Sequence, residues 1–300
     1  MADFDDLFTP KENTITPETS DQSFDKDAWA KKKQEQREAV YTMIDDTVKS
    51  VAGSGAKFQE YLDLQSRFDR YSVSNALLIL AQRPKATRIA DFDTWKEQGA
   101  YIRKRESGFY ILEPGEEYTR EDGTTAVGYN PKKVFDVSQT GNTRRRETRP
   151  YPDDRTRLKA LMDHAPVSVH INDELPEGIN AAYISEQREI QIRRGMDAGD
   201  IFRCLSQELA QAEMDKGDKP YDRDEHAFHA YCASYMLCKQ FGVDTSGYRF
   251  DGTPKVFEGM EPQDIRVELS TIRDAAEEIS DRMNRMLAQQ REQKRQESER

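Results

Sequence analysis

The sequence predicts an α+β fold in two domains: N-terminal helices with a small antiparallel sheet, then an α+β domain with a helical C-terminus. Its 300 residues exceed what one hydrophobic core usually supports. Apolar residues recur at helical spacing up to Pro84, and short alternating runs bounded by Gly, Asn and Pro follow. Helical spacing returns after residue 197 and gives the second half its helical character.

Residues 1–25 carry seven acidic side chains against Lys11 and have no apolar periodicity, so we expect a disordered acidic tail. The first domain then begins with three helices, because apolar residues recur at helical spacing. Glycines end the first helix and Pro84 ends the third. The expected helices cover residues 26–51, 58–70 and 75–83.

After Pro84 the pattern changes to short β-type runs, with a turn-prone stretch at 121–131 between two of them. We expect strands within 103–114 and 132–140, so that the first domain covers residues 26–140. Residues 141–157 are polar, basic and contain prolines, a composition typical of an exposed linker between domains.

The second domain is predicted over residues 158–285, followed by a solvated, charged tail at 286–300. It combines β-type segments, one of them a hairpin that turns at 185–189, with strongly helical stretches. The expected elements are a helix at 158–164, strands within 167–173 and 181–195, and helices at 198–216, at 223–241 and from Pro262 onward.

Composition and motifs narrow the function classes. A formal charge of −11 argues against a uniformly basic protein that coats duplex DNA. The N-terminus lacks a basic segment followed by an apolar one, and no run of about 18 apolar residues occurs, so we expect a cytoplasmic protein. Three cysteines without a CxxC pair fit a reducing compartment. The sequence also lacks the phosphate-binding and nucleophile-elbow motifs of nucleotide and serine hydrolases.

Cations are concentrated in the first domain. Between residues 56 and 112 there are ten Lys and Arg against seven Asp and Glu, interleaved with aromatic and amide side chains. Single-stranded nucleic acid needs this mixture, because its phosphates bind cations and its unstacked bases stack on aromatic rings. The same composition fits a domain core with solvated charges, so composition leaves both interpretations open. The candidate DNA contacts are Arg70, Tyr71, Ser72, Asn75, Arg83, Trp95, Arg103, Lys104, Arg105 and Tyr110.

Several landmarks occur in order in this region, namely Tyr71, Ser72, Asn75, the run from Ala81 to Pro84, Trp95, Gly99, Gly108 and the run from Phe135 to Ser138. With them, residues 58–140 resemble the N-terminal domain of the antirestriction protein ArdC and of LtrC-like proteins of conjugative elements. The resemblance implies that this domain binds single-stranded DNA. It departs at residues 105–108, where the family has a glycine and Lys-Gly-Glu, but the loop stays basic.

Metallopeptidase helices of the HExxH type place two His residues one turn apart as zinc ligands, with the Glu as general base on the zinc-bound water. At the corresponding place this chain reads Gln207, Glu208, Leu209, Ala210 and Gln211. Both ligand positions hold a neutral amide, which competes poorly with water for Zn²⁺, and only the base is kept. Without a metal to polarise the carbonyl, Glu208 is not expected to hydrolyse a peptide.

The segments around this motif resemble the peptidase domain that follows the DNA-binding domain in ArdC and LtrC-like proteins. Residues 181–192 resemble the strand pair before the metal-binding helix, and residues 233–250 resemble the segment after it. In those relatives the next helix supplies an acidic third ligand, and the equivalent residue here is Tyr231. The resemblance therefore implies a metallopeptidase fold that has lost its metal, with no other cofactor.

A displaced metal site is sterically open on the helix that follows. Glu225 with His229, or His229 with Cys232, share a helix face, and His226 lies beside them. No matched pair of ligands is evident on a partner element, so we expect these residues to be structural. An active metallopeptidase with such a non-standard site is the alternative.

These observations lead us to expect a bacterial mobile-element protein that binds single-stranded DNA and carries a catalytically inactive peptidase-like domain. Antirestriction, protection of transferred strands and a replication accessory role stay open at this point. A third interpretation is a peptide-binding module, in which the strand at 189–192 pairs with a protein partner along the vestigial cleft.

Overall fold

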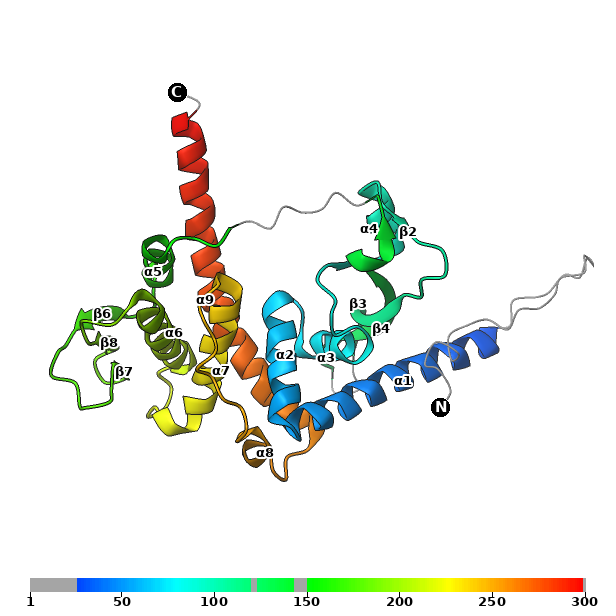
Figure 1. Ribbon diagram of the computed structural model, residues 1–300. Helices are drawn as coiled ribbons and strands as arrows, with labels where there is room; N and C mark the ends of the chain where they lie inside the picture. Colours follow the sequence, from blue (N-terminus) through cyan, green and yellow to red (C-terminus); the bar gives the residue numbers. More distant parts are fainter. Residues whose placement is uncertain (1–25, 120–122, 143–149, 299–300) are drawn as a thin grey trace, which may run out of the picture. The chain divides into compact units, whose positions relative to one another are not determined.

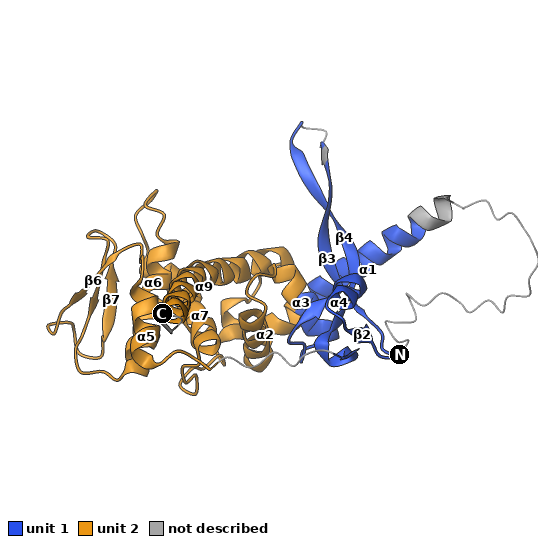
Figure 2. Cartoon of the chain, turned by 90° about the horizontal axis from the view of Figure 1, so that it is seen from above, with its two compact units in different colours: residues 1–47, 77–145 blue, residues 48–76, 146–300 orange. Residues whose placement is uncertain are grey.

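The computed structural model describes residues 26–119, 123–142 and 150–298, and it confirms the α+β class (Figure 1). The tail predicted at 1–25 lies outside the described residues. The chain divides into two compact units, which Figure 2 distinguishes by colour. Unit 1 comprises residues 1–47 and 77–145, and unit 2 comprises residues 48–76 and 146–300. Within the described part of the chain, no helix is long and apolar enough to cross a membrane.

The helices of unit 1 enclose a small apolar core. They are the first part of α1 (Lys26–Ala52), most of α3 (Val73–Gln82) and the short α4 (Phe92–Glu97). Asp91 caps α4 by accepting a hydrogen bond from the Thr94 amide at 2.7 Å. The buried side chains of this core include Val40, Ile44, Leu77, Leu78, Ile79, Trp95, Phe109 and Val134.

Two antiparallel sheets complete unit 1. One has the strand order β1-β4-β3, and in the other β2 pairs with β5. The long, twisted ribbon that β3 and β4 form is seen in Figure 2. The strands are β1 (Ile89–Ala90), β2 (Tyr101–Ile102), β3 (Phe109–Thr119), β4 (Thr125–Asp136) and β5 (Thr140–Gly141).

The stretch at 121–131, predicted to be turn-prone, is largely strand, because β4 already begins at Thr125. Pro131 is tolerated in β4 because only β3 pairs with the strand there, whereas β1 pairs with the strand end at Phe135 and Asp136. The ladder changes register between Pro114 and Glu117, so the ribbon contains an irregularity on the β3 side.

Asp136 fixes the end of β4 and the turn that follows it. Its carboxylate is 1% exposed and caps the 3₁₀ helix η2 (Val137–Gln139) by accepting from the Ser138 amide at 2.9 Å. The same carboxylate accepts from the amides of Thr87 at 2.8 Å and Arg88 at 3.1 Å. Burial alone would raise the pKa of Asp136, but these hydrogen bonds outweigh it and lower the pKa.

Unit 2 is a group of helices beside a three-stranded sheet of order β6-β8-β7. The central strand β8 pairs parallel with β6 and antiparallel with β7, which confirms the hairpin predicted within 181–195. The elements are α2 (Gly55–Arg67), α5 (Asp154–Met162), β6 (Ser168–Ile171), β7 (Ala181–Ile184), β8 (Glu189–Ile192), α6 (Ala198–Met214), α7 (Arg223–Phe241), α8 (Thr253–Val256) and α9 (Pro262–Ser298).

Helix α2 packs within unit 2, whereas the sequence analysis assigned residues 26–140 to one domain. Phe58 of α2 is fully buried, and its ring centroid lies 5.5 Å from that of Phe228 and 5.7 Å from that of Phe250. The apolar spacing of α2 shows that the helix has a buried face, but it does not show which helix covers that face. The division of the chain therefore follows packing and not sequence order.

Two boundaries in unit 2 also differ from the prediction. Helix α5 begins at Asp154, inside the linker predicted at 141–157, because Asp153 caps it by accepting from the Thr156 amide at 2.9 Å. The final helix was predicted to run into the charged tail at 286–300, and α9 does continue as far as Ser298, but the first two side chains of this tail, Met286 and Leu287, are buried and not solvated.

Asp136→Ala is expected to lower the free energy of unfolding of unit 1 by about 2 kcal/mol, because it removes the acceptor of buried amide groups. The lowered pKa means that this contribution is present above the unfolded-state pKa of about 3.9 and is lost as the pH falls through the folded-state pKa. Urea unfolding between pH 7 and pH 3, followed by the fluorescence of the buried Trp95, measures both effects. Equal unfolding midpoints for variant and wild type at pH 7 would contradict this role.

Candidate nucleic-acid interface and remnant peptidase site

The turn between β2 and β3 carries three consecutive exposed cations, Arg103, Lys104 and Arg105. The Arg103 amide donates to the Gln139 carbonyl at 3.0 Å, which extends the β2–β5 ladder, and the Glu106 amide donates back to the Arg103 carbonyl at 3.3 Å. Arg105 has a φ of 67°, in the left-handed region that tight turns use. Within the described part of the chain, the side chains of Lys104 and Arg105 form no hydrogen bond or ion pair, so the turn presents both cations to solvent.

Gln139 and Glu106 hold this turn against η2. The buried Gln139 donates from Nε2 to the Ser107 carbonyl at 2.6 Å and to Glu106 Oε2 at 3.2 Å. Glu106 Oε1 accepts from Arg103 at 3.0 Å, and its Oε2 lies 3.9 Å from Arg83 Nη2. The Gln139 amide and the Arg103 guanidinium lower the pKa of Glu106. The structure thus brings two predicted contacts, Arg83 and Arg103, to the same carboxylate.

Tyr101 supplies an exposed aromatic ring beside this turn, although the sequence analysis did not select it. Its side chain is 61% exposed, and the residue pairs with Gly141 across the β2–β5 ladder. A Cβ atom on Gly141 would lie 2.4 Å from Tyr101 Cζ, so the ring lies directly over the glycine backbone. Residues two apart on an extended strand share a face, which places Tyr101 on the same side as Arg103. The arrangement offers an aromatic platform next to cations.

Trp95 cannot be the stacking platform that the sequence analysis proposed. Its ring is fully buried in the core of unit 1, and Nε1 donates to the Phe135 carbonyl at 2.9 Å. The Arg88 guanidinium lies 4.9 Å from the ring centroid and adds a cation–π contact. A buried ring with its N–H satisfied is a core residue, and the aromatic signal at this position reflects packing.

Tyr110 and Arg83 have structural contacts in unit 1. Both backbone groups of Tyr110 bond to the Gln82 side chain, with its amide donating at 2.9 Å and its carbonyl accepting at 2.8 Å. The Tyr110 ring is half-buried, with Lys133 Nζ 5.9 Å from its centroid. Arg83 also donates to Ser138 Oγ at 3.5 Å, so its half-exposed guanidinium lies at η2.

Four of the predicted DNA contacts belong to unit 2. Ser72 and Asn75 lie at the start of α3, where the Asn75 amide donates to Ser72 Oγ at 3.3 Å. The Tyr71 ring is half-buried and packs edge-on against Phe68, with 5.5 Å between centroids. Arg70 is 74% exposed and lies 3.3 Å from Asp281. The Ser72 hydroxyl thus has a helix-capping role that accounts for it without DNA.

The motif predicted as a peptidase remnant lies on α6. Glu208 is 4% exposed and forms a bidentate ion pair with Arg223, with Nη1 to Oε2 and Nη2 to Oε1 both at 2.6 Å. Glu208 Oε2 also accepts from the backbone amide of Tyr183 on β7 at 2.7 Å. The carboxylate that a metallopeptidase would use as its base is therefore bound here by a guanidinium and a strand amide.

The two ligand positions of the motif hold amides in different surroundings. Gln211 is fully buried; its Oε1 accepts from the Tyr221 hydroxyl, and its Nε2 donates to the Arg223 carbonyl at 3.5 Å. Gln207 is half-buried. Tyr231, which the resemblance places at the third ligand position, accepts a hydrogen bond from the Arg249 amide through its hydroxyl at 2.7 Å. Gln211 and Tyr231 thus each bond to another part of unit 2.

His226, His229 and Cys232 do not provide the alternative metal site. Cys232 is fully buried, and burial raises the pKa of its thiol well above the usual value. His229 Nε2 lies 2.5 Å from Glu268 Oε2, while the His226 ring stacks on Tyr221 with 5.3 Å between centroids. Among the residues that the structure describes, no group of three or more His, Cys, Asp or Glu is placed to hold a metal ion.

The prediction that the strand at 189–192 pairs with a peptide is wrong. This strand is β8, the centre of its sheet, and β6 and β7 already pair with its two sides. A peptide can add only to an exposed sheet edge, where backbone groups are unpaired. The Tyr183 amide of the edge strand β7 is itself bound by Glu208.

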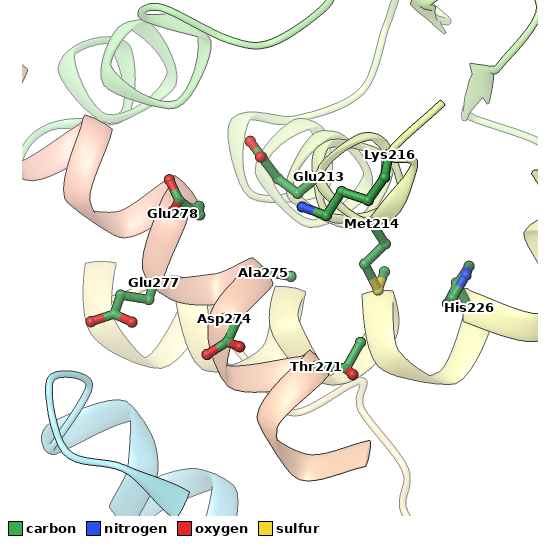
Figure 3. Close-up of a pocket in the computed structure, with 9 residues that line it drawn as sticks. All are labelled: Glu213, Met214, Lys216, His226, Thr271, Asp274, Ala275, Glu277 and Glu278. Carbon is green, nitrogen blue, oxygen red and sulfur yellow. The ribbon is translucent and has the colours of Figure 1, made fainter. Parts of the chain in front are cut away.

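A cavity of about 420 Å³ lies between α6, α7 and α9 (Figure 3). Three of its four acidic side chains are paired with arginines: Glu213 with Arg282 at 2.6 Å, and Asp274 and Glu277 with Arg273 at 2.7 and 2.5 Å. None of the peptidase-motif residues lines it, so this cavity is separate from the remnant site. The lining residues are Glu213, Met214, Lys216, His226, Thr271, Asp274, Ala275, Glu277 and Glu278.

Comparison with known proteins shows a resemblance to ArdC. Residues 34–152 match the family model described as the N-terminal domain of the anti-restriction factor ArdC. Over residues 34–152 the sequence of this chain therefore resembles the N-terminal domain of ArdC. A search of curated proteins gave no match to the chain.

One protein whose solved structure is similar to this chain is the antirestriction ArdC protein from the R388 plasmid. Its Mn(II)-bound crystal structure covers 80% of this chain and 98% of its own, with a TM-score of 0.53 and 16% identity. The metal-free crystal structure of the same protein covers 72% and 86%, with a TM-score of 0.46 and 18% identity. At this identity the Mn(II)-bound structure establishes that the two proteins share a fold.

The R388 protein has been crystallised with Mn(II), so the residues of α6 in this chain can be compared with the ligands that a divalent cation needs. Divalent cations of this kind are held most tightly by imidazole and carboxylate groups, and neutral amide oxygens alone compete poorly with water for them. Here Gln207 and Gln211 present amides, and the carboxylate of Glu208 is bound by the Arg223 guanidinium. These residues do not fit a divalent metal ion.

Proposed function

We propose that this chain is an ArdC-like protein of a bacterial mobile genetic element that binds single-stranded DNA, while its peptidase-like unit has no hydrolytic activity. The observation that carries the proposal is the exposed Tyr101 ring, packed on Gly141, on the strand that leads into the turn with the exposed cations Lys104 and Arg105. All of these residues lie within the match to the ArdC N-terminal domain, which supports the assignment.

The chemistry of this surface suits a single strand. Lys104 and Arg105 would bind phosphates, and Tyr101 would stack on a base, which the strand exposes and a duplex does not. Glu106 partly neutralises Arg83 and Arg103, so the two solvent-facing cations of the turn would provide most of the attraction. Because the whole chain has a charge of −11, binding should be local and strongly dependent on salt.

The proposed setting is the cytoplasm during transfer of an element between cells, in an antirestriction, strand-protecting or replication accessory role. The name of the R388 neighbour supports antirestriction as the first of these. Arg70, Tyr71, Ser72 and Asn75 stay predicted contacts from unit 2. The amides at the ligand positions of α6 support a binding function over turnover.

Lys104→Ala with Arg105→Ala is expected to weaken binding to a labelled single-stranded oligonucleotide by about tenfold at low salt, similarly for different sequences. Loss of two phosphate contacts should also flatten the slope of log K against log salt concentration by about 1.4. Fluorescence anisotropy over a salt series, with duplex as competitor, measures both quantities.

The matched control is Lys31→Ala with Lys32→Ala, which removes the same charge from exposed positions of α1 that precede the ArdC match. This control is expected to change affinity by less than about twofold, because its effect on distant phosphates is screened. An equal loss in the control, or an unchanged salt slope in the turn variant, would remove the turn from the proposed interface.

Tyr101→Ala is expected to cost about 1–3 kcal/mol of single-strand affinity through the lost stacking, whereas Tyr101→Phe should keep the affinity. Tyr151→Ala is the control, because Tyr151 in unit 2 is also 61% exposed and its ring also lies over a glycine, Gly242. Anisotropy at fixed salt reports the affinities. If Tyr101→Phe lost as much as Tyr101→Ala, the hydroxyl and not the ring face would be the contact.

A further inference from the structure

The buried carboxylate of Glu208 sets a requirement that its surroundings must meet. Its side chain is 4% exposed, and a buried carboxylate is costly unless it is paired with a cation and hydrogen-bonded. In an HExxH peptidase, the divalent cation and its bound water supply that positive charge. The corresponding residues of α6 do not fit such a cation, so another group has to supply the charge in this chain.

Arg223 meets this requirement. A planar guanidinium offers two parallel N–H groups that match the two carboxylate oxygens, and both contacts to Glu208 measure 2.6 Å. Arg223 is the first residue of α7, directly after Asp222, which caps the helix by accepting from the Asp224 amide at 2.9 Å. A capped helix end therefore delivers the guanidinium, and the Tyr183 amide completes the shell around the carboxylate at 2.7 Å.

The segment that carries Arg223 also bonds to the residue at one of the ligand positions on α6. Gln211 bonds to the Tyr221 hydroxyl and to the Arg223 carbonyl. The Tyr221 ring packs edge-on against Tyr183, with 5.8 Å between centroids, and stacks on His226. Residues 221–223 are thus held against α6 and β7 by polar and aromatic contacts that are independent of the Glu208 ion pair.

We infer that Arg223 has replaced the metal ion as the cation of this site, so that residues 221–223 exclude a divalent metal even when imidazole ligands are restored on α6. The inference rests on the proposed peptidase-like character of unit 2 and adds the group that substitutes for the metal. Simple loss of ligands makes the opposite prediction, because restoring them would then restore metal binding.

The first test measures Zn²⁺ binding to full-length variants by isothermal titration calorimetry. The double variant Gln207→His with Gln211→His is compared with a triple variant that adds Arg223→Gln. A control triple variant adds Arg203→Gln instead, because Arg203 lies on α6 and pairs with Asp200 at 2.6 Å.

The expected result is that the double variant and the control bind Zn²⁺ no more tightly than the wild type, while the Arg223→Gln triple variant gains one site at least about tenfold tighter, in line with the removal of a like charge beside it. Tight Zn²⁺ binding by the double variant, or no gain on adding Arg223→Gln, would overturn the inference.

The second test needs no metal. Arg223→Gln alone is expected to lower Tm by about 5 °C, a modest value because the arginine side chain is 42% exposed, and adding Glu208→Gln should recover most of the loss. Arg203→Gln serves again as the control and should shift Tm by less than about 2 °C. An unchanged Tm for Arg223→Gln, or losses that simply add in the double variant, would overturn the inference.

Single-strand affinity of the same variants separates this inference from the proposed function. All of them should bind the oligonucleotide like the wild type, since none of the altered residues is among the proposed DNA contacts. Failure of the zinc and Tm tests with DNA binding retained would overturn the inference alone. Absence of DNA binding in the wild type would overturn the proposed function and leave those two tests interpretable.

Discussion

Unit 2 depends on one constraint, which is that α7 has to be covered on every side. Every residue from 232 to 238 is buried, so two turns of this helix have no solvent-facing side. Helices α6, α9 and α2 provide the cover, and α2 reaches it from the N-terminal part of the chain. Burial of Phe58 contributes about 2–3 kcal/mol to this packing. Inside it, the hydroxyls of Ser206, Ser234 and Tyr248 bond to one another at 2.7 Å, so the Ser234 hydroxyl on α7 does not oppose burial.

Two buried carboxylates show two ways of meeting the same electrostatic demand. Asp136 in unit 1 is neutralised by backbone amides of an adjoining turn, and those hydrogen bonds lower its pKa despite burial. Glu208 in unit 2 is bound by the guanidinium of Arg223. A charged donor binds a carboxylate more strongly than a neutral amide does, and few free amides lie near the middle of a helix. The amides around Asp136 order the turn that follows β4, and the guanidinium bound to Glu208 holds the start of α7 against α6. Each carboxylate therefore fixes one element of its own unit.

Much of the fold could be predicted from local patterns, because helical spacing, caps and turn residues act within a few positions. Most helices and the β7–β8 hairpin were predicted near their observed bounds, and the HExxH-like register at residues 207–211 was read from sequence alone. The candidate interface was harder to predict. Trp95 and Tyr101 carry the same aromatic signal, yet one ring is fully buried and the other is 61% exposed, and only packing separates them. Arg223 has no motif that links it to Glu208 fifteen positions earlier.

The sequence by itself determined the α+β class, the order of the elements, the resemblance to ArdC and the amides at residues 207 and 211 of α6. These properties depend on which residues are present and on their spacing along the chain. The tertiary structure alone decided that α2 packs in unit 2, that Tyr101 and not Trp95 faces solvent, that β8 is central in its sheet, and that Arg223 binds Glu208. The physical reason is that burial and ion pairing join residues distant in sequence, and their outcome depends on which surfaces meet when the chain folds.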